Sequence, residues 1–424
     1  MDMLVRPKAE SRVGPHYHKG RPSIRTRSIS SRLTGTGLDR AQLSIFTSFQ
    51  ECESLWRTAI ERCTCFAFQT FEWQSTWYAT IGKAEGVRAY IIHVADKTGR
   101  TVLILPLGIY PRKGLRFLSF LGGIVTDYNV PLIEPEFAAK ISNTEFSLLW
   151  ASVLDLLPRI DVVWLRRMPD TIEGTKNPMI ALPGAVHTEN AHAAFLPGTL
   201  PAFRAKRPTK FFKDNERRRR RLSERGRIDV CVPVVPEEAI ETLETMAHQK
   251  SRRYRETRVR DLFACPGYLQ FYRVLTTMPF QKGGVHISCL RLNNQTLATH
   301  WGLIFNRRFY WLMPSYQGGD WGRYSVGRLL LENVVEWCIS EQMSVFDLTV
   351  GDERFKFDWA DHSLPLYEYF APRSVKGAVF TSARQLRATL RARLKRSEHI
   401  RTCVRWLKAR FRAGFVKSIG FGDQ

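Results

Sequence analysis

The short segment Tyr324–Arg328 precedes an amphipathic stretch and contains a glycine, Gly327. A helix that begins here presents backbone N–H groups that have no acceptor inside the helix. The N–H groups of Val326, Gly327 and Arg328, together with the helix dipole, suit a phosphate. Glycine also lets a phosphate approach the backbone closely. An ordinary helix with Ser325 as its N-cap explains the same residues, so both interpretations stay open at this point.

A histidine, His300, lies within a predicted strand, Thr296–Phe305. Alternation along the strand places Ala298, His300 and Gly302 on one face. These small neighbours leave room beside the imidazole for a ligand or for a closely packed helix. His300 is therefore a candidate general base toward an incoming amine or hydroxyl. A buried, hydrogen-bonded structural histidine is the alternative.

An acidic residue, Asp347, falls in the middle of a second predicted strand. A carboxylate in that position needs a partner if it is buried. Arg354 and Lys356 follow soon after, so an ion pair that closes the turn is one interpretation. The alternative is a catalytic base, or a group that orients an acceptor.

The first half of the chain has its own candidate binding residues. Asp127 and Tyr128 follow a pair of glycines, and loops of this kind often carry binding groups. An Asx-turn is the alternative for Asp127. Trp73 and Trp77 share one face of a predicted helical turn, where they either stack on a sugar-like acceptor or pack one helix on another.

These residues are positioned by a pattern of elements that occurs twice. Residues 87–110 predict a hairpin, followed by a third strand, a helix and a further strand, and residues 285–350 repeat this order. We expect domains at 39–200 and 201–372, joined by a basic helix that ends near Gly226. The predicted class is α/β (α+β), with mixed, mostly antiparallel sheets flanked by helices.

Composition excludes several classes of protein. A hydrophobic content of 44% with 11 Trp and 26 Phe excludes a chain that is disordered throughout. No apolar run reaches the ~18 residues of a membrane span, and no leader is recognisable, so we expect a cytoplasmic protein. The eight cysteines lack zinc spacing, which predicts free thiols and no metal.

The net charge of +24 is concentrated in both tails and in the segment Arg204–Arg227. Residues 1–38 are predicted to form a disordered basic tail. Residues 373–424 are predicted to form a basic amphipathic helical tail, with Leu386, Leu390 and Leu394 on its apolar face and residues 404–415 continuing it. This pattern favours contact with an anionic surface such as a membrane, and makes nucleic acid an unexpected partner.

Several segments together resemble the CelD/BcsL family of acetyltransferase-like proteins of cellulose and polysaccharide biosynthesis. The order and spacing of these segments, over roughly residues 45–370, carry the resemblance. They are Phe71-Glu72-Trp73 with Trp77, Thr126-Asp127-Tyr128, the basic helix Phe211–Leu222, Tyr324-Ser325-Val326-Gly327-Arg328-Leu329-Leu330, and Phe346–Glu353 followed by Phe355-Lys356. The family is similar to the tandem GNAT transferases of the Fem type.

The resemblance implies two GNAT domains, with an acyl-carrier site in the second. It implies acetyl-CoA or another acyl-CoA as donor, and an amine, hydroxyl or saccharide as acceptor. The implied carrier-binding residues are Arg323, Ser325, Val326, Gly327, Arg328 and Leu329. The fourth strand of the second domain would supply an N–H to the thioester carbonyl, and Tyr316 or Tyr310 would protonate the leaving thiolate. Asp127, Tyr128, Trp73 and Lys356 would meet the acceptor, while His300 and Asp347 would act in catalysis.

Two departures keep other functions open. The glycine loop matches the GNAT pattern only in part, because Arg323 is one position out of register and Val326 stands where relatives often have proline. A Fem-type transferase that uses aminoacyl-tRNA, gripped by the Arg204–Arg227 segment, is one alternative. A non-catalytic GNAT scaffold that docks on a membrane or an acidic partner is the other.

Overall fold

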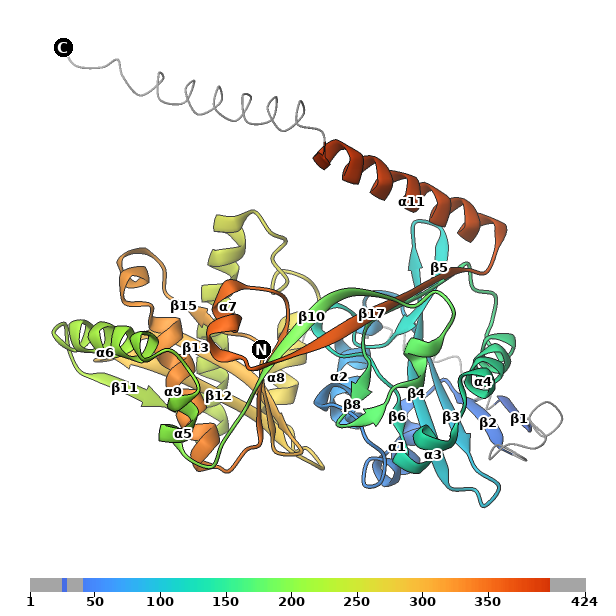
Figure 1. Ribbon diagram of the computed structural model, residues 1–424, viewed down its shortest axis with the longest axis horizontal. Coiled ribbons are helices and arrows are strands. Elements are labelled where there is room, and N and C mark those ends of the chain that lie inside the picture. The colour runs from blue at the N-terminus through green and yellow to red at the C-terminus, as the bar shows by residue number, and fades with distance from the viewer. Residues whose placement is uncertain (1–24, 29–40, 397–424) are drawn as a thin grey trace, which may run out of the picture.

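The computed structural model describes residues 25–28 and 41–396. In this part of the chain, fifteen strands form one continuous sheet that runs through both halves of the molecule. We call residues 41–200 the first half and residues 201–372 the second half. Helices cover the sheet on either side, and helix α11 extends away from the first half (Figure 1).

The first half follows the predicted order of hairpin, third strand, helix and strand. Asp96 accepts hydrogen bonds from the N–H groups of Thr98 and Arg100, which fixes the β3–β4 hairpin. The strands are β1 Arg25–Ser28, β2 Gln42–Phe46, β3 Arg88–Ala95, β4 Thr101–Arg112, β5 Leu115–Phe120, β6 Leu132–Ile133, β7 Val162–Pro169, β8 Thr171–Ile172, β9 Thr175–Lys176 and β10 Val186–Phe195. The helices are α1 Phe49–Ala59, α2 Phe71–Trp77, α3 Pro135–Lys140 and α4 Asn143–Leu156, with short helical turns at Ala67–Gln69, Tyr78–Gly82, Gly123–Val125 and Pro178–Ala181.

The second half repeats this order. Its strands are β11 Ile228–Cys231, β12 Gly284–Leu292, β13 Gln295–Phe305, β14 Arg308–Trp311, β15 Ser315–Tyr316, β16 Val345–Val350 and β17 His362–Pro372. Its helices are α5 Leu200–Ala205, α6 Thr209–Ser223, α7 Pro236–Thr257, α8 Tyr268–Thr277, the 3₁₀ turn Gly319–Tyr324, α9 Val326–Ser340 and α10 Arg354–Trp359, and α11 Val375–Arg396 follows the second half. In each half one parallel pair stands among antiparallel pairs, β5 with β7 and β14 with β16.

The two halves exchange one strand each. Strand β10, from the first half, pairs with β16 of the second half, and β17, from the second half, pairs with β7 of the first. β10 and β17 also pair with each other, so they cross the centre of the molecule together (Figure 1). The predicted boundary between residues 200 and 201 therefore separates strands that belong to one sheet.

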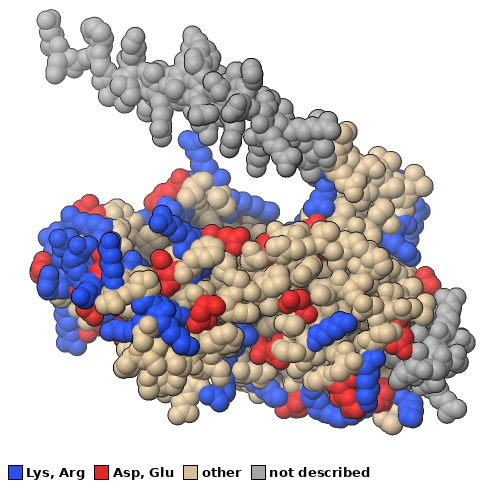
Figure 2. All heavy atoms as spheres, viewed as in Figure 1, with Lys and Arg blue, Asp and Glu red and all other residues tan. Residues whose placement is uncertain are grey.

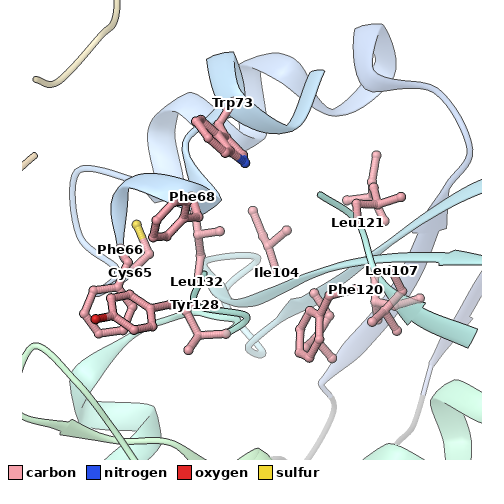
Figure 3. Close-up of a cluster of buried hydrophobic side chains, with 14 of the residues drawn as sticks. Cys65, Phe66, Phe68, Trp73, Ile104, Leu107, Phe120, Leu121, Tyr128 and Leu132 are labelled. Atoms are coloured by element: carbon pink, nitrogen blue, oxygen red, sulfur yellow. The ribbon is translucent and has the colours of Figure 1, made fainter. Parts of the chain in front are cut away.

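An apolar core joins the halves beside this exchange. Trp73 is completely buried and packs edge-to-face on Phe271 of α8, with ring centroids 4.9 Å apart. Phe68, Phe66 and Tyr128 gather next to Trp73 in the same cluster (Figure 3). Burial of several large aromatic rings at one junction provides a strong apolar driving force for the halves to associate.

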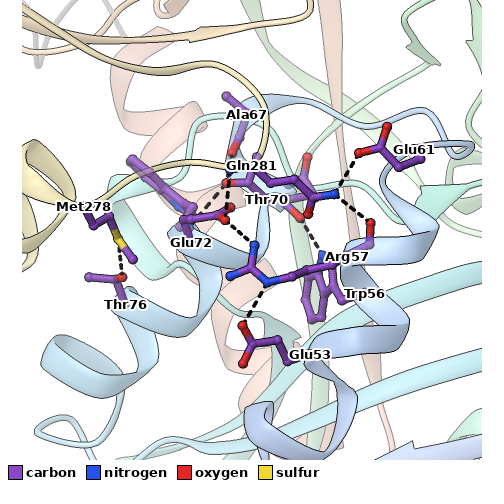
Figure 4. A network of polar contacts seen from close by, with 12 residues as sticks. Glu53, Trp56, Arg57, Glu61, Ala67, Thr70, Glu72, Thr76, Met278 and Gln281 are labelled. Atoms are coloured by element: carbon purple, nitrogen blue, oxygen red, sulfur yellow. Dashed lines mark hydrogen bonds and ion pairs between the residues drawn. The ribbon is translucent and has the colours of Figure 1, made fainter.

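Polar contacts reinforce the junction at its rim. Arg57 forms an ion pair with Glu72 at 2.6 Å in the first half (Figure 4). Gln281 of the second half donates from its side chain to the carbonyl of Arg57 and to Glu61, and from its backbone N–H to Glu72. The loop that leads into β12 is thereby tied to α1 and α2.

The Asp347 carboxylate forms a deeply buried polar link between the halves. It accepts hydrogen bonds from the Tyr128 hydroxyl at 2.7 Å, from the Arg308 guanidinium at 2.9 Å and from the N–H of Thr349 at 2.8 Å. Arg308 also pairs with Glu173 of the first half. Although burial alone would lower the pKa of Arg308, the Asp347 charge raises it. The partners of Asp347 therefore differ from the predicted Arg354 and Lys356.

Three segments differ from the sequence-based expectation. The tail expected to be disordered contributes β1, which pairs with the edge strand β2. The fourth strand of the second domain, expected to run on to Tyr316, is broken into β14 and β15, and between them only the Met313 N–H donates to a described strand, at the Trp301 carbonyl of β13. α11 begins at Val375 and leaves Val375, Val379 and Leu386 exposed. The side chains of Leu390 and Leu394 and residues 404–415 lie outside the described residues.

Removing partners of Asp347 is expected to destabilise the protein in a graded way. Arg308→Met leaves a buried carboxylate without its cation and should lower the free energy of unfolding by about 3–5 kcal/mol. Tyr128→Phe removes one hydrogen bond and should lower it by about 1–2 kcal/mol. Urea unfolding measures both, with Tyr316→Phe as control because Tyr316 is exposed. Equal effects of Tyr128→Phe and Tyr316→Phe would contradict the bridging role of Tyr128.

Candidate active site

The parallel strands β14 and β16 separate soon after they begin to run together. They pair from Arg308 with Val345 to Tyr310 with Asp347, and no pairing follows. Beyond this point β15 turns toward β13, where Tyr316 pairs with Ala298. Pro314 helps to end the strand, because it has no N–H to donate. A gap therefore opens between the two strands at the edge of α9.

A cavity of about 360 Å³ lies at this gap. The start of α9 forms one wall, through Val326, Gly327 and Arg328. The opposite walls come from Trp311, Pro314 and Tyr316 of the fourth-strand segment and from Phe355, Asp358 and Trp359 of α10. Its size and mixed lining are those of a small-molecule site.

The N-terminus of α9 is open to this cavity. Ser325 adopts a left-handed conformation with φ of +51°, and its side chain does not cap the helix. The Ser325 hydroxyl accepts a hydrogen bond from Arg218 of α6 instead. Among the described residues, the N–H groups of Val326 and Gly327 donate a hydrogen bond to no backbone carbonyl. The N–H of Arg328, which the sequence analysis assigns to the phosphate site, instead donates to the Ser325 carbonyl and is not free.

Positive side chains surround this helix end. Arg218 donates to the Arg323 carbonyl at 2.8 Å as well as to Ser325. Arg328 lies 4.1 Å above the ring of Phe211 and donates to its carbonyl. Partial burial lowers the pKa of Arg328, although the Asp214 carboxylate opposes this shift. The charge of α6 therefore contributes to an anion-attracting entrance.

The structure brings together only part of the predicted carrier site. Ser325, Val326, Gly327 and Arg328 line the cavity with Tyr316. Arg323 points to solvent over the Tyr324 ring, and the Leu329 side chain is buried in the core. An alanine-sized Cβ on Gly327 would lie 3.4 Å from the Tyr316 ring, so the two residues are in close contact across the cavity.

The imidazole of His300 lies under the cavity but does not line it. It is fully buried and stacks on the Trp311 ring, with centroids 3.8 Å apart. Neither ring nitrogen has a hydrogen-bond partner among the described residues. Burial holds the pKa of His300 well below its usual value, and the charges of His286 and Lys250 lower it further. The imidazole is therefore neutral and shielded from water.

The predicted acceptor residues do not form one open site. Trp73 and Tyr128 are buried at the junction of the halves and face no solvent, so the expected contact with an acceptor is not met by either. Lys356 is also buried, and its ammonium donates to the carbonyls of Thr349 and Val350, which closes the strand exit. Asp127 alone is partly exposed, and it forms an ion pair with Arg167 at 2.9 Å.

Sequence reasoning missed several residues of the site. Arg218 was recognised only as part of a basic segment, and Trp311, Phe355 and Trp359 carried no sign of a cavity. The N–H of Leu312 is a further case, because it lies where β14 leaves β16 and finds no acceptor among the described residues. Proline two positions later, at Pro314, is the one sequence signal that marks this break.

Comparisons with known proteins agree with this geometry. Residues 209–357 match the family model described as an acetyltransferase (GNAT) domain. No curated protein matches the chain by sequence. Among residues 25–28 and 41–396, no helix is long and apolar enough to cross a membrane, and no three acidic, His or Cys side chains gather to hold a metal.

Several solved structures are similar to this chain at low sequence identity. FemX is 10% identical with a TM-score of 0.53, over 76% of this chain and 96% of the FemX chain. A conserved protein of unknown function from Bacteroides thetaiotaomicron is 11% identical with a TM-score of 0.46, over 77% of this chain and 98% of its own. A tandem GNAT protein from the clavulanic acid pathway is 12% identical with a TM-score of 0.44, over 83% and 100%.

The predicted fold class is confirmed as α/β, with a GNAT fold of mixed sheets flanked by helices. The open helix end and the separated strands both lie within the matched segment. The second half of this chain therefore carries a GNAT acetyltransferase domain, and the protein is an acyltransferase.

Proposed function

We propose that this protein transfers an acyl group from acyl-CoA, with acetyl-CoA as the simplest donor, to an amine or hydroxyl of a small acceptor. The observation that supports this most directly is the cavity at the open end of α9, beside Trp311, where β14 ends and its pairing with β16 has stopped. An extended pantetheine arm fits between strands that have separated, because their unpaired backbone groups offer it hydrogen bonds. The phosphates would then meet the N–H groups of Val326 and Gly327.

The proposed chemistry needs few side chains. The N–H of Leu312 would polarise the thioester carbonyl and stabilise the oxyanion that forms during transfer. Tyr316 would protonate the thiolate that leaves, since it lines the cavity and lies 40% exposed. Arg328 and Arg218 would hold the donor's phosphates in place.

The acceptor would approach at the junction of the halves, near Asp127. Removal from water raises the pKa of the Asp127 carboxyl, whereas Arg167 and the Thr349 hydroxyl oppose the rise. Asp127 would bind or orient the acceptor, while Trp73, Tyr128, Asp347 and Lys356 support the junction behind it. Only the resemblance of the sequence motifs supports a saccharide acceptor and a role in polysaccharide synthesis.

A Fem-type transferase that uses aminoacyl-tRNA is the second candidate. The outer face of α6 favours it, because Lys210, Lys213, Arg220 and Arg221 are all exposed there. Lys and Arg side chains gather over this end of the molecule (Figure 2). Binding of tRNA that weakens steeply with salt would support this candidate.

Liposome binding that is lost on deletion of residues 376–424 would instead support peripheral membrane contact through the tail.

The donor assignment predicts that Gly327→Glu prevents binding of acetyl-CoA. The new carboxylate would occupy the cavity and repel the phosphates, so affinity measured by calorimetry should fall at least about 100-fold. Gly327→Ala should change affinity little, because its Cβ fits against Tyr316. Gly198→Glu is the matched control, since it introduces the same charge in open space away from the cavity. Unchanged affinity in Gly327→Glu would reject the donor site.

The buried histidines predict a pH dependence of stability. Burial lowers the pKa of His286 from 6.5 to about 4, so only the unfolded chain takes up this proton between those values. The neutral imidazole therefore contributes to the free energy of unfolding above pH 6.5, and this contribution is lost as pH falls toward 4. For His286 the loss amounts to about 3 kcal/mol. Unfolding by urea at pH 7 and pH 4.5 measures it.

His286→Phe should flatten this dependence, because the phenyl ring keeps the packing on Trp337 and cannot titrate. The exposed His248→Phe is the control and should leave the dependence unchanged. A wild-type stability that does not fall below pH 6 would refute the assignment of neutral histidines to this core.

A further inference from the structure

A second cavity, which we call the first-half cavity, lies above the separated strands β5 and β7. Its volume is about 540 Å³. Strand residues such as Ser119 and Arg166 form its floor, while Tyr254, Arg260 and Leu262 of the second half form its opposite wall. The cavity therefore exists only when both halves are assembled, and nothing in the donor chemistry above uses it.

This cavity occupies the strand gap that corresponds, in the first half, to the donor gap. The equivalent helix, α4, is closed at its start by a reciprocal cap. The Ser142 hydroxyl accepts from the N–H of Glu145, and the Glu145 carboxylate accepts from the N–H of Ser142. The cap thus engages the N–H groups of Ser142 and Glu145, whereas Ser325 provides no such cap for α9.

A β-bulge directs two adjacent arginines into the cavity. Consecutive residues of a regular strand point to opposite faces. Opposite Glu368 of β17, however, β7 carries the extra residue of a bulge, and Arg167 there adopts φ of +56°. Arg166 and Arg167 both line the cavity as a result. A left-handed conformation is unfavourable for a residue with a side chain, and such positions are often functional.

The positive charge of the arginines that line this cavity is only partly neutralised by carboxylates. Arg167 pairs with Asp127 at 2.9 Å and with Glu189 at 3.6 Å, and Arg112 pairs with Glu85 at 3.8 Å. Neither Arg166 nor Arg260 has a carboxylate partner in the described part of the chain. Arg166 is exposed at the cavity, and Arg167 places a second positive charge beside it. An anion bound beside Arg166 and Arg167 would reduce the repulsion between their positive charges.

Aromatic rings stand beside the positive groups. The Arg166 guanidinium lies 4.6 Å from the ring centre of Trp164, which also lines the cavity. Tyr254 faces them from α7. Flat apolar faces next to fixed cations suit a ring-bearing ligand with a negative group.

Helix α7 contributes one residue to this cavity and another to the donor site. Tyr254 lines the first-half cavity, and Arg252, on the same turn, donates to the Tyr316 carbonyl at 2.6 Å. Arg167 also reaches Asp127, our proposed acceptor residue. A ligand held by its anionic group in the first-half cavity would extend past Arg167 toward Asp127.

We propose that the first-half cavity binds the phosphate or carboxylate of the acceptor, so that this enzyme acylates an acidic, ring-bearing small molecule. The inference rests on the proposed acyl transfer and adds the class of acceptor to it. Arg166 and Arg260 bind the anion directly, whereas Arg167 is a positioning residue that joins the cavity to Asp127.

Ligand-observed saturation-transfer NMR with three sugars of the same ring tests this proposal. Glucose 6-phosphate and glucuronate should give signals with the wild-type protein, whereas glucose should not. A signal from only one acid identifies phosphate or carboxylate as the group recognised. Equal signals from all three sugars would overturn the proposal.

Arg166→Gln should weaken binding of the acidic sugar at least about tenfold, since it removes a charge-assisted hydrogen bond. Arg260→Gln should act in the same direction, and its exposed loop position avoids any effect on folding. Arg384→Gln is the matched control, because Arg384 lies 5.0 Å from the Trp164 ring but outside the cavity. A loss as large in Arg384→Gln as in Arg166→Gln would also overturn the proposal.

Acetyl-CoA affinity, measured in parallel, separates the two proposals. Arg166→Gln should bind acetyl-CoA like the wild type, and Gly327→Glu should still bind the acidic sugar. If acetyl-CoA binds and the acidic sugars do not, the acceptor inference alone fails. If the acidic sugars bind and acetyl-CoA does not, the donor assignment alone fails.

Discussion

The buried carboxylate of Asp347 sits where the architecture divides. It is the last residue of β16 to pair with β14, so the strands part directly beyond it. An uncompensated charge at this depth would be strongly destabilising, which obliges Tyr128 and Arg308 to stay in place. Because Tyr128 comes from the first half, this one group couples the assembly of the halves to the opening of the donor gap.

The two halves use the same fold for different purposes. In the first half, α4 is capped by its own residues, whereas α9 leaves its first amides facing a cavity. The difference lies at Ser325, which adopts a left-handed conformation and whose hydroxyl accepts from Arg218 and does not cap the helix. α6 therefore does more than join the halves, since it keeps the helix end available.

Local patterns made much of the fold predictable. The hairpins, the repeated order of elements and the helix after Gly327 follow from periodicity and turn residues within short windows. The exchange of β10 and β17 was not predictable, because pairing between residues 150 to 210 positions apart has no local signal. The same holds for Trp73 and Tyr128, whose residue types suit an acceptor site as well as a core. Packing against Phe271 and bonding to Asp347 decided between these roles.

The candidate site was predictable only as a backbone feature. Gly327 marked the helix start, and Tyr316 fell on the correct strand segment, but the cavity also needs Trp311, Phe355 and Trp359. These aromatic residues resemble ordinary core positions in a sequence. His300 was predicted as a site residue but is a core residue, because Trp311, rather than a ligand, fills the space beside its small neighbours.

Strand exchange also constrains how this chain acquires its structure during synthesis. When residue 200 leaves the ribosome, β7 still lacks its neighbour β17, and β10 has no β16 to join. Both open edges must wait for more than 140 further residues, an interval in which unpaired strands invite aggregation. We therefore expect the nascent chain to depend on chaperones until residue 372 has emerged, and a version cut between the halves to be insoluble.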